Sequence, residues 1–384
     1  FFDNIIPDNN NIGIYNKSSE TELNLFFGTF NQYKALKKII QNVEKKVNIY
    51  VTQESHLKFI EESKNINRKV IISNKRSYFI MLIFLIIRFK YIFKIFIQND
   101  SSKFKFLISS NNKIYLILSS FINEFKTSKN KLILLSNCYN RTNICLILVC
   151  RLFNIKTVYL EHGAITDKFP PLICDYNFLD GQYSYEKYIK IENDHNINIP
   201  FKRFIFLLGK ITFAKDNCLS GSVIKSNCIG FCIGLRDEIS KIIMDCDLCL
   251  KYGFSISIRL HPRESKERKK IFTRYTDSRK YIKLHLALEK DISSFFDEIF
   301  CCLACSSSIQ LESAIAGIPN LYRLWSWQGL EDRFEYVKNG LSIQTINEKD
   351  LIEKLNLAKK GRLIVKDELI KYYSQSFGEN NFGN

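Results

Sequence analysis

Three short stretches of the sequence combine imidazole, carboxyl, hydroxyl and glycine groups in patterns that suit group transfer. In the first, VYLEHGAITD, an apolar run ends in Glu161, His162 and Gly163, and a second acid, Asp167, follows. An imidazole beside carboxyl groups at the end of a strand can take a proton from a hydroxyl group. The stretch therefore predicts a general base, for which Glu161, His162 and Asp167 are the candidates.

The second stretch, FSISIRLHP, is a strand pattern that ends in Arg259, His261 and Pro262. Proline has no backbone N–H and stops a strand ladder, so His261 is expected at the exit of the strand. There the imidazole can donate to a phosphate oxygen, and Arg259 can add a charge-assisted contact. A structural histidine with its hydrogen bonds satisfied is the alternative.

The third stretch, ACSSSIQLESAIAGIP, places Ser306, Ser307 and Ser308 between a buried strand and the start of a helix. Free backbone N–H groups and hydroxyls at such a point favour an anion site. An ordinary N-cap explains one serine well and three in a row less well. Glu312 comes one helical turn after Ser308 and can reach a ribose hydroxyl, although a solvated glutamate is the alternative.

A further candidate for the nucleotide site is IGFCIGLRDE, in which Gly230 and Gly234 flank a strand. Gly234 and Arg236 lie in the predicted turn into the next helix. Glycine lets a ligand approach the backbone, and the arginine can serve a diphosphate. Glycine is also common at such turns without any ligand.

Strands and helices alternate along the chain, which predicts an α/β fold with parallel sheets. The 384 residues allow two domains. The predicted strands are Val47–Val51, Leu132–Leu135, Thr157–Leu160, Ile229–Ile233, Ser255–Leu260, Phe300–Ala304 and Asn320–Tyr322. The predicted helices are Asn143–Phe153, Glu238–Tyr252, Ile292–Glu298 and Ile309–Ala316.

A polar connection between Ile189 and Phe206 is the predicted linker. It gives an acceptor-side Rossmann-like domain over residues 1–195 and a nucleotide-sugar-binding one over residues 196–384. Sites in open parallel sheets lie beyond the carboxyl ends of the strands, where the candidate residues fall. We expect the two doubly wound domains to face each other across a cleft.

The EHG, RLHP and SSS motifs on two Rossmann-like domains resemble the GT-B glycosyltransferases, over about Leu132 to Ser342. The His-Pro and Ser-Ser features are similar to bacterial sialyltransferases and related transferases of capsule and lipopolysaccharide synthesis. The resemblance implies a CMP-activated, sialic-acid-like donor and an inverting mechanism. His261 would then assist the departing phosphate, two of Ser306, Ser307 and Ser308 would bind it, and the EHG site would take the acceptor proton.

The sequence departs from those sialyltransferases because His162 stands where they carry the second acid of an acid-acid-glycine motif. Either His162 is the base, oriented by Glu161 or Asp167, or the donor class differs. A His-Gly pair also resembles the CDP-glycerol polyolphosphate transferases. Those enzymes usually carry an acidic, aromatic run before the serines, which Ala304-Cys305 does not match, so they are the second choice.

Most of the net charge of +17 comes from residues 64 to 151, which include 16 lysines and arginines but only two acidic residues. Within this stretch, Arg76–Phe96 is a helical pattern with a broad apolar face. This composition predicts an interfacial helix on an anionic membrane surface and a lipid-linked or glycan acceptor. A core helix with snorkelling lysines is the alternative. A basic protein binding RNA or an anionic polymer is the non-enzymatic alternative, although no nucleic-acid motif is present.

The longest apolar run, Tyr78–Ile87, is too short to span a bilayer. Most of the twelve cysteines lie in apolar patterns, which indicates a reducing cytosol. Two pairs, Cys246/Cys249 and Cys302/Cys305, have zinc-ligand spacing but lack the turns of zinc sites. Asp245-Cys246-Asp247 imitates a metal-binding motif inside a predicted helix. We expect no metal or other cofactor, and a protein peripheral to the inner face of the cell membrane.

Overall fold

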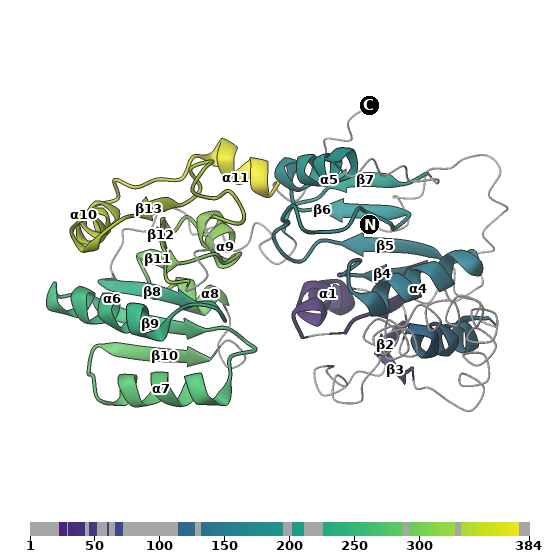
Figure 1. Ribbon diagram of the computed structural model, residues 1–384, viewed down its shortest axis with the longest axis horizontal. Helices are drawn as coiled ribbons and strands as arrows, with labels where there is room; N and C mark the ends of the chain where they lie inside the picture. Colours follow the sequence, from purple (N-terminus) through teal and green to yellow (C-terminus); the bar gives the residue numbers. More distant parts are fainter. Residues whose placement is uncertain are drawn as a thin grey trace, which may run out of the picture. The chain divides into compact units, whose positions relative to one another are not determined.

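The computed structural model describes residues 23–28, 30–42, 46–51, 60, 66–71, 114–126, 132–194, 202–210, 226–286, 292–326 and 332–375. They form two sheets in which every described strand pairing is parallel (Figure 1). The predicted α/β class with two doubly wound sheets is therefore confirmed. The predicted basic helix over Arg76–Phe96 lies outside the described residues.

The first sheet has seven strands in the order β3-β2-β1-β4-β5-β6-β7. Its strands are β1 (Leu23–Phe26), β2 (Val47–Val51), β3 (Ile66–Val70), β4 (Leu132–Leu135), β5 (Lys156–Leu160), β6 (Tyr176–Leu179) and β7 (Phe204–Leu207). Its helices include α1 (Phe30–Asn42), α4 (Arg141–Leu152), α5 (Gln182–Asp194) and a helix over residues 114–125.

The second sheet has six strands in the order β10-β9-β8-β11-β12-β13. Its strands are β8 (Cys228–Ile233), β9 (Ser255–Leu260), β10 (Ile282–Leu286), β11 (Cys301–Ala304), β12 (Asn320–Arg323) and β13 (Ile343–Thr345). Its helices are α6 (Ile239–Lys251), α7 (Lys266–Asp277), α8 (Ile292–Phe296), α9 (Ile309–Ile315), α10 (Glu348–Lys359) and α11 (Asp367–Tyr373).

Most predicted elements are found within one or two residues of their expected ends, and three strands match at both ends. The predicted linker was too long. Helix α5 continues to Asp194 and strand β7 begins at Phe204, so neither end of the polar stretch is a connection. The intervening residues 195–201 lie outside the described part of the chain.

Two compact units are defined by the contacts within the chain: residues 1–135 with 145–157, and residues 136–144 with 158–384. The second unit contains the second sheet together with β6, β7, α5 and the loops after β4 and β5. All predicted site residues belong to this unit. The functional boundary expected near residue 195 stays a prediction.

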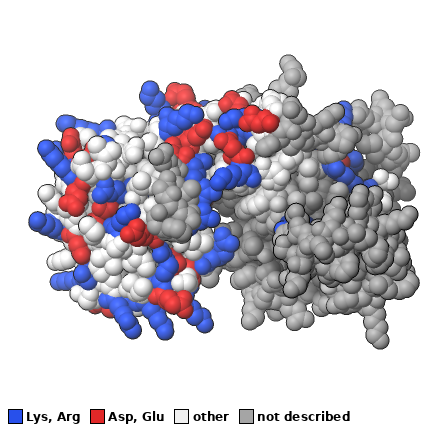
Figure 2. Space-filling model, viewed as in Figure 1, with Lys and Arg blue, Asp and Glu red and all other residues white. Residues whose placement is uncertain are grey.

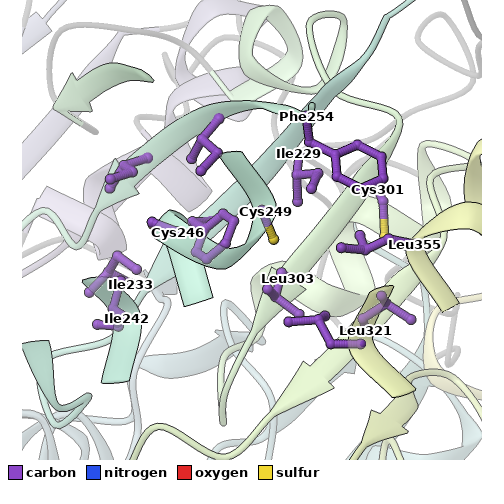
Figure 3. Close-up of a cluster of buried hydrophobic side chains, with 14 of the residues drawn as sticks. Ile229, Ile233, Ile242, Cys246, Cys249, Phe254, Cys301, Leu303, Leu321 and Leu355 are labelled. Atoms are coloured by element: carbon purple, nitrogen blue, oxygen red, sulfur yellow. The ribbon is translucent and has the colours of Figure 1, made fainter. Parts of the chain in front are cut away.

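The alternation of side chains along β8 places a core on each face of the second sheet. Ile229, Phe231 and Ile233 contribute to a large apolar cluster that includes side chains of α6, α7 and α10. Figure 3 labels part of this cluster, including Cys246 of α6 and Leu355 of α10. Cys232 points to the other face, where Phe295 of α8 lies. The described cysteines are reduced and mostly buried, so they act as small apolar side chains.

The surface in Figure 2 shows lysines and arginines interspersed with acidic side chains over the coloured part of the molecule. Within the described ranges, no helix has both the length and the apolar character needed to cross a membrane.

Asp245 anchors α6 to β12 and explains the apparent metal motif. Its carboxylate accepts bonds from Arg323 Nε at 2.9 Å and from Trp325 Nε1 at 2.7 Å, and the residue is 4% exposed. Removal of one member of a buried pair leaves the others without partners. We therefore assign Asp245 a structural role.

We predict that Asp245→Ala lowers the free energy of unfolding by about 3 to 5 kcal/mol, measured by urea denaturation. Asp247→Ala is the matched control, because Asp247 lies on the same helix but is half exposed, and we expect it to cost less than about 1 kcal/mol. Equal losses in the two variants would contradict the structural role of Asp245.

Candidate functional site

The strand order of the second sheet brings three of the predicted stretches to one place. Strands β9, β8 and β11 are neighbours, and the crossovers that follow β8 and β11 leave in opposite directions. In open parallel sheets such a reversal opens a crevice at the carboxyl ends of the two strands. Here those ends are followed by Gly234 to Arg236 and by Ser306 to Ser308, with His261 after β9.

The turn after β8 is fixed by a buried carboxylate. Asp237 accepts a hydrogen bond from the Gly234 backbone N–H at 2.6 Å, and Arg268 donates to the Asp237 carbonyl at 2.8 Å. Arg268 also pairs with Glu264 at 2.8 Å, which ties the turn to the loop after β9. Arg236 is exposed at the tip of this turn. The two loops therefore form one rigid edge.

His261 is held in one tautomer by its own loop. The Arg263 backbone N–H donates to His261 Nδ1 at 3.0 Å, so the neutral ring carries its proton on Nε2. Burial and then the nearby Arg263 charge lower the pKa of His261 to about 4. The ring is therefore neutral at pH 7 and has an Nε2–H group that can donate to an anion.

Helix capping explains only part of the serine run before α9, because the Ser307 hydroxyl accepts a hydrogen bond from the Ile309 backbone N–H at 3.5 Å. Ser308 occupies the N-cap position with helical backbone angles, and its side chain makes no capping bond. The Ser306 hydroxyl lies 3.5 Å from the Arg333 backbone N–H and contacts the Tyr322 hydroxyl. All three serines are partly exposed, and they follow the carboxyl end of β11.

Two residues predicted for the nucleotide site lie in packing contacts. The Arg259 guanidinium lies 5.5 Å from the centre of the Phe295 ring, on the face that α8 covers, and the residue is 6% exposed. A Cβ atom on Gly230 would come within 2.5 Å of Ile299, so this glycine serves close packing of strand and helix. A Cβ atom on Gly234 would instead lie 3.1 Å from the Asp237 carboxylate, which occupies the space beside this glycine.

His162 follows β5 and keeps one ring nitrogen without a protein partner. The imidazole is hydrogen-bonded to the Ser136 backbone carbonyl, while Nδ1 is buried and accepts no bond. Burial and the Lys210 charge lower the pKa of His162 to about 4. The neutral ring therefore has an oriented lone pair on Nδ1, as a general base requires.

Glu161 and Glu312 lie in a buried charge cluster with Asp180 and Lys210. Glu161 accepts bonds from the Asp180 backbone N–H at 2.9 Å and from the Ser184 hydroxyl at 2.7 Å. Lys210, 7% exposed, pairs with Glu312 at 3.0 Å. The second sheet's α9 is thus joined to the segment after β7.

The cluster has more carboxyl groups than cations. Burial, and then the Asp180 charge, raise the pKa of Glu161 well above its usual value. Burial raises the pKa of Asp180 to about 7 although Lys210 opposes the shift. Glu312 and the other two carboxylates raise the pKa of Lys210 against the effect of its burial. The Glu161 and Asp180 pair therefore retains a proton near neutral pH.

Asp167 pairs with α5 and does not contact His162 through any described bond. Lys187 donates to Asp167 and to Glu335, both at 3.0 Å, and so links the loop after β5 to the segment 332–340. Lys187 lowers the pKa of Asp167 through this hydrogen bond and its charge. The assignment of Asp167 as a base remains a prediction.

Sequence reasoning missed four residues beside these groups. Tyr139 follows β4, and its ring is nearly parallel to that of His162 with centres 6.5 Å apart. The positive charge of Arg263 reaches both Tyr139 and His261. Tyr139 and Arg263 lie next to predicted strand ends, so a search of those ends could have found them. Arg333 and Lys210 lie in no sequence motif that indicates a site.

No group of three or more histidine, cysteine or acidic side chains suited to a metal ion occurs in the described part of the chain. Cys246 and Cys249 are fully buried on α6, and Cys302 lies with its sulfur 3.6 Å from that of Cys232.

Neither a family model nor a curated protein matches this sequence. Solved structures do resemble it. UDP-GlcNAc 2-epimerase of Methanocaldococcus jannaschii, in complex with UDP-GlcNAc and UDP, aligns over 91% of this chain and 97% of its own, with 14% identity and a TM-score of 0.54.

The UDP-GlcNAc 2-epimerase of Neisseria meningitidis, bound to UDP-GlcNAc, aligns over 92% of this chain and 96% of its own, with 14% identity and a TM-score of 0.55. The calicheamicin glycosyltransferase CalG4 aligns over 92% of each chain, with 9% identity and a TM-score of 0.53. At such identities the likeness concerns the fold, and it confirms the GT-B architecture.

We predict that the Cε1–H resonances of His162 and His261 titrate with midpoints near pH 4 in the free protein. Addition of a nucleotide should raise the midpoint of His261, because a phosphate favours the imidazolium form, and leave that of His162 nearly unchanged. His162→Gln and His261→Gln assign the resonances. Midpoints near 6.5, the usual value for histidine, would contradict the buried environments described here.

Proposed function

We propose that this chain is a glycosyltransferase whose nucleotide-sugar donor binds at the carboxyl edge of the second sheet. The observation that carries the proposal is the meeting of His261, the Ser306 to Ser308 run and the Gly234 turn at the reversal of strand order. The GT-B likeness to CalG4, a glycosyltransferase, and to epimerases with bound nucleotide sugars supports a nucleotide-sugar donor.

In this proposal the donor's glycosyl–phosphate bond breaks and its electron pair stays on the phosphate oxygen. The Nε2–H of His261 and the serine hydroxyls donate to the phosphate as its negative charge grows. The acceptor hydroxyl attacks the sugar carbon from the opposite face, and its proton passes to Nδ1 of His162. The configuration at the sugar carbon is therefore inverted.

The environments of the three candidate bases favour His162. Both oxygens of Glu161 accept hydrogen bonds inside the protein, and Asp167 is paired with Lys187. His162 combines an orienting bond with a buried acceptor atom that has no described hydrogen-bond partner, whereas Asp167 also has Lys190 4.0 Å from its second oxygen.

We further propose a CMP-activated, sialic-acid-like donor, on the resemblance of the His-Pro and serine motifs to sialyltransferases. We propose a glycan or lipid-linked acceptor at the inner face of the membrane, on the excess of cations between residues 64 and 151. We propose that His261 and the serine hydroxyls meet the phosphate charge, together with Arg236 at the turn after β8, and that no metal is needed.

A nucleotide-sugar 2-epimerase is the second candidate, because several structures of similar fold are UDP-GlcNAc 2-epimerases. Such an enzyme inverts a carbon of its nucleotide sugar and needs no acceptor. Incubation with UDP-GlcNAc alone, followed by NMR of the C2 proton, distinguishes the two. Appearance of the C2 epimer would favour the epimerase and contradict the transferase.

We predict that CMP binds the wild-type protein more tightly than UMP in calorimetric titration, and that His261→Ala weakens CMP binding by about tenfold or more. His261→Gln should retain most of the affinity, because its side-chain amide can donate near the position of Nε2. His261→Asn is the matched control, since its shorter amide cannot reach that position. Equal affinity in all three variants would contradict the role of His261.

We predict that His162→Ala lowers turnover by about two to four orders of magnitude and leaves donor affinity nearly unchanged. Release of the free nucleotide from the donor, with acceptor present, is the measurement. Asp167→Asn should leave turnover within about tenfold of wild type. A mild effect at His162 together with a large one at Asp167 would transfer the base assignment to Asp167.

A further inference from the structure

Helix α4 has apolar side chains on both its inner and its outer face. On the inner face, Leu146, Ile147 and Cys150 are fully buried. On the outer face, Leu148 is 51% exposed and Leu152 is 65% exposed. A surface helix usually carries polar residues on its outer side, because apolar area exposed to water is unfavourable. The outer side of α4 therefore has the composition of a contact surface.

The two exposed leucines lie on one side of the helix. They are four residues apart, which places one above the other along the helix axis. Arg151 comes three residues after Leu148, on the same side, and is partly exposed, as is Phe153 directly after the helix. Leu148, Arg151, Leu152 and Phe153 are here called the α4 face. All four belong to the first compact unit.

The end of α4 is held by backbone hydrogen bonds, so the α4 face is ordered. Asn154 has a φ of 55°, the left-handed conformation with which many helices end. Its N–H donates to the Arg151 carbonyl at 3.2 Å, and the Ile155 N–H donates to the Cys150 carbonyl at 2.8 Å. Ile155 is buried and leads into β5. An ordered surface loses little conformational entropy when a partner binds.

The charge of this part of the chain restricts the partner. Residues 125–160 contain six lysines and arginines and no acidic residue. A second copy of the chain would bring the same positive charge to the α4 face. So would residues 72–113, which contain eight lysines and arginines and one acid. A nucleic acid has negative charge but no hydrocarbon that could cover the leucines, whereas an anionic lipid surface has both.

We infer that the α4 face binds the surface of an anionic bilayer, with Leu148 and Leu152 among the acyl chains and Arg151 at the headgroup phosphates. The inference deepens the proposed function and rests on it, because a lipid-linked acceptor requires the enzyme at a bilayer. It assigns the contact to a surface within the described residues, in addition to the interfacial helix expected over Arg76–Phe96.

The direct test is tryptophan fluorescence of the whole protein with vesicles of equimolar phosphatidylcholine and phosphatidylglycerol. Leu152→Trp places an indole on the α4 face, and Met244→Trp is the matched control, because Met244 is 61% exposed on α6. Wild type, which has two tryptophans, gives the background emission. We expect vesicles to shift the emission of the Leu152→Trp variant to shorter wavelength, and brominated acyl chains to quench it. The Met244→Trp variant should show neither effect.

Vesicle sedimentation measures how much the α4 face contributes to binding. Leu148→Gln combined with Leu152→Gln keeps good helix formers and should weaken binding about tenfold or more. Arg151→Gln should weaken it about fivefold, whereas Met244→Gln should bind as wild type does. Wild type should bind phosphatidylcholine vesicles more weakly than the mixed ones. Equal binding by wild type and the double leucine variant would overturn the inference.

Other occupants of the α4 face give different results. Short-wavelength emission of the Leu152→Trp variant without vesicles, unchanged when they are added, would mean that protein covers the face and would overturn the inference. Sedimentation equilibrium then distinguishes a second copy from a segment of the same chain. A shift caused by RNA but not by vesicles would assign the face to a nucleic acid and would also overturn it.

CMP affinity, measured on the same samples, separates this inference from the proposed function. Contact of the α4 face with lipid in a protein that binds no nucleotide would support the membrane surface and contradict the glycosyltransferase. CMP binding without lipid contact at Leu152→Trp would overturn the membrane surface and leave the donor site supported.

Discussion

The reversal of strand order between β8 and β11 is the constraint on which the site depends. A crossover that follows one strand packs on one face of the sheet, and the crossover of its neighbour packs on the other. The carboxyl ends of β8 and β11 are thus left uncovered, and short loops with small or polar residues fill the edge. Gly234, His261 and the serines meet there because of this topology and not because of their distance in sequence.

The same unit contains a cluster of ionisable side chains away from its surface. The cluster consists of Glu161, Asp180, Lys210 and Glu312. One ammonium group lies among three carboxyl groups, and the raised pKa values of Glu161 and Asp180 indicate that a retained proton removes one of the negative charges. The C-terminal segment closes over it, since Ser374 accepts from the Lys210 N–H at 3.0 Å. Gly209, with a φ of +80°, leaves room for the Gln375 carbonyl that a side chain would displace.

The fold could be predicted from sequence because buried parallel strands are continuous apolar runs that end at polar residues. Leu132–Leu135 follows that pattern, whereas Ser255–Leu260 alternates apolar and polar residues; both strands were predicted at both ends. Helix α5 was not predicted because its sequence is polar. Its buried face is formed partly by tyrosines and by the aliphatic part of the Lys187 side chain, which a search for apolar residues does not detect. Polarity alone therefore suggested a linker where the chain is helical.

The candidate site was only partly predictable. Strand ends indicated His162, His261 and the serines, but nothing in the motif EHG distinguishes a glutamate that accepts internal bonds from one that faces a ligand. That distinction depends on Ser184 and Asp180, which are about twenty residues away and meet Glu161 only in the folded chain. The same holds for Lys210 and Glu312, which are 102 positions apart.

The position of the donor can be determined by a crystal structure with a non-hydrolysable CMP- or UDP-sugar analogue. We expect the phosphate to lie at the carboxyl ends of β8 and β11, within hydrogen-bonding distance of His261 Nε2 and of at least one hydroxyl among Ser306 to Ser308. A nucleotide bound elsewhere, with those groups in contact only with protein or solvent, would contradict the proposed donor site.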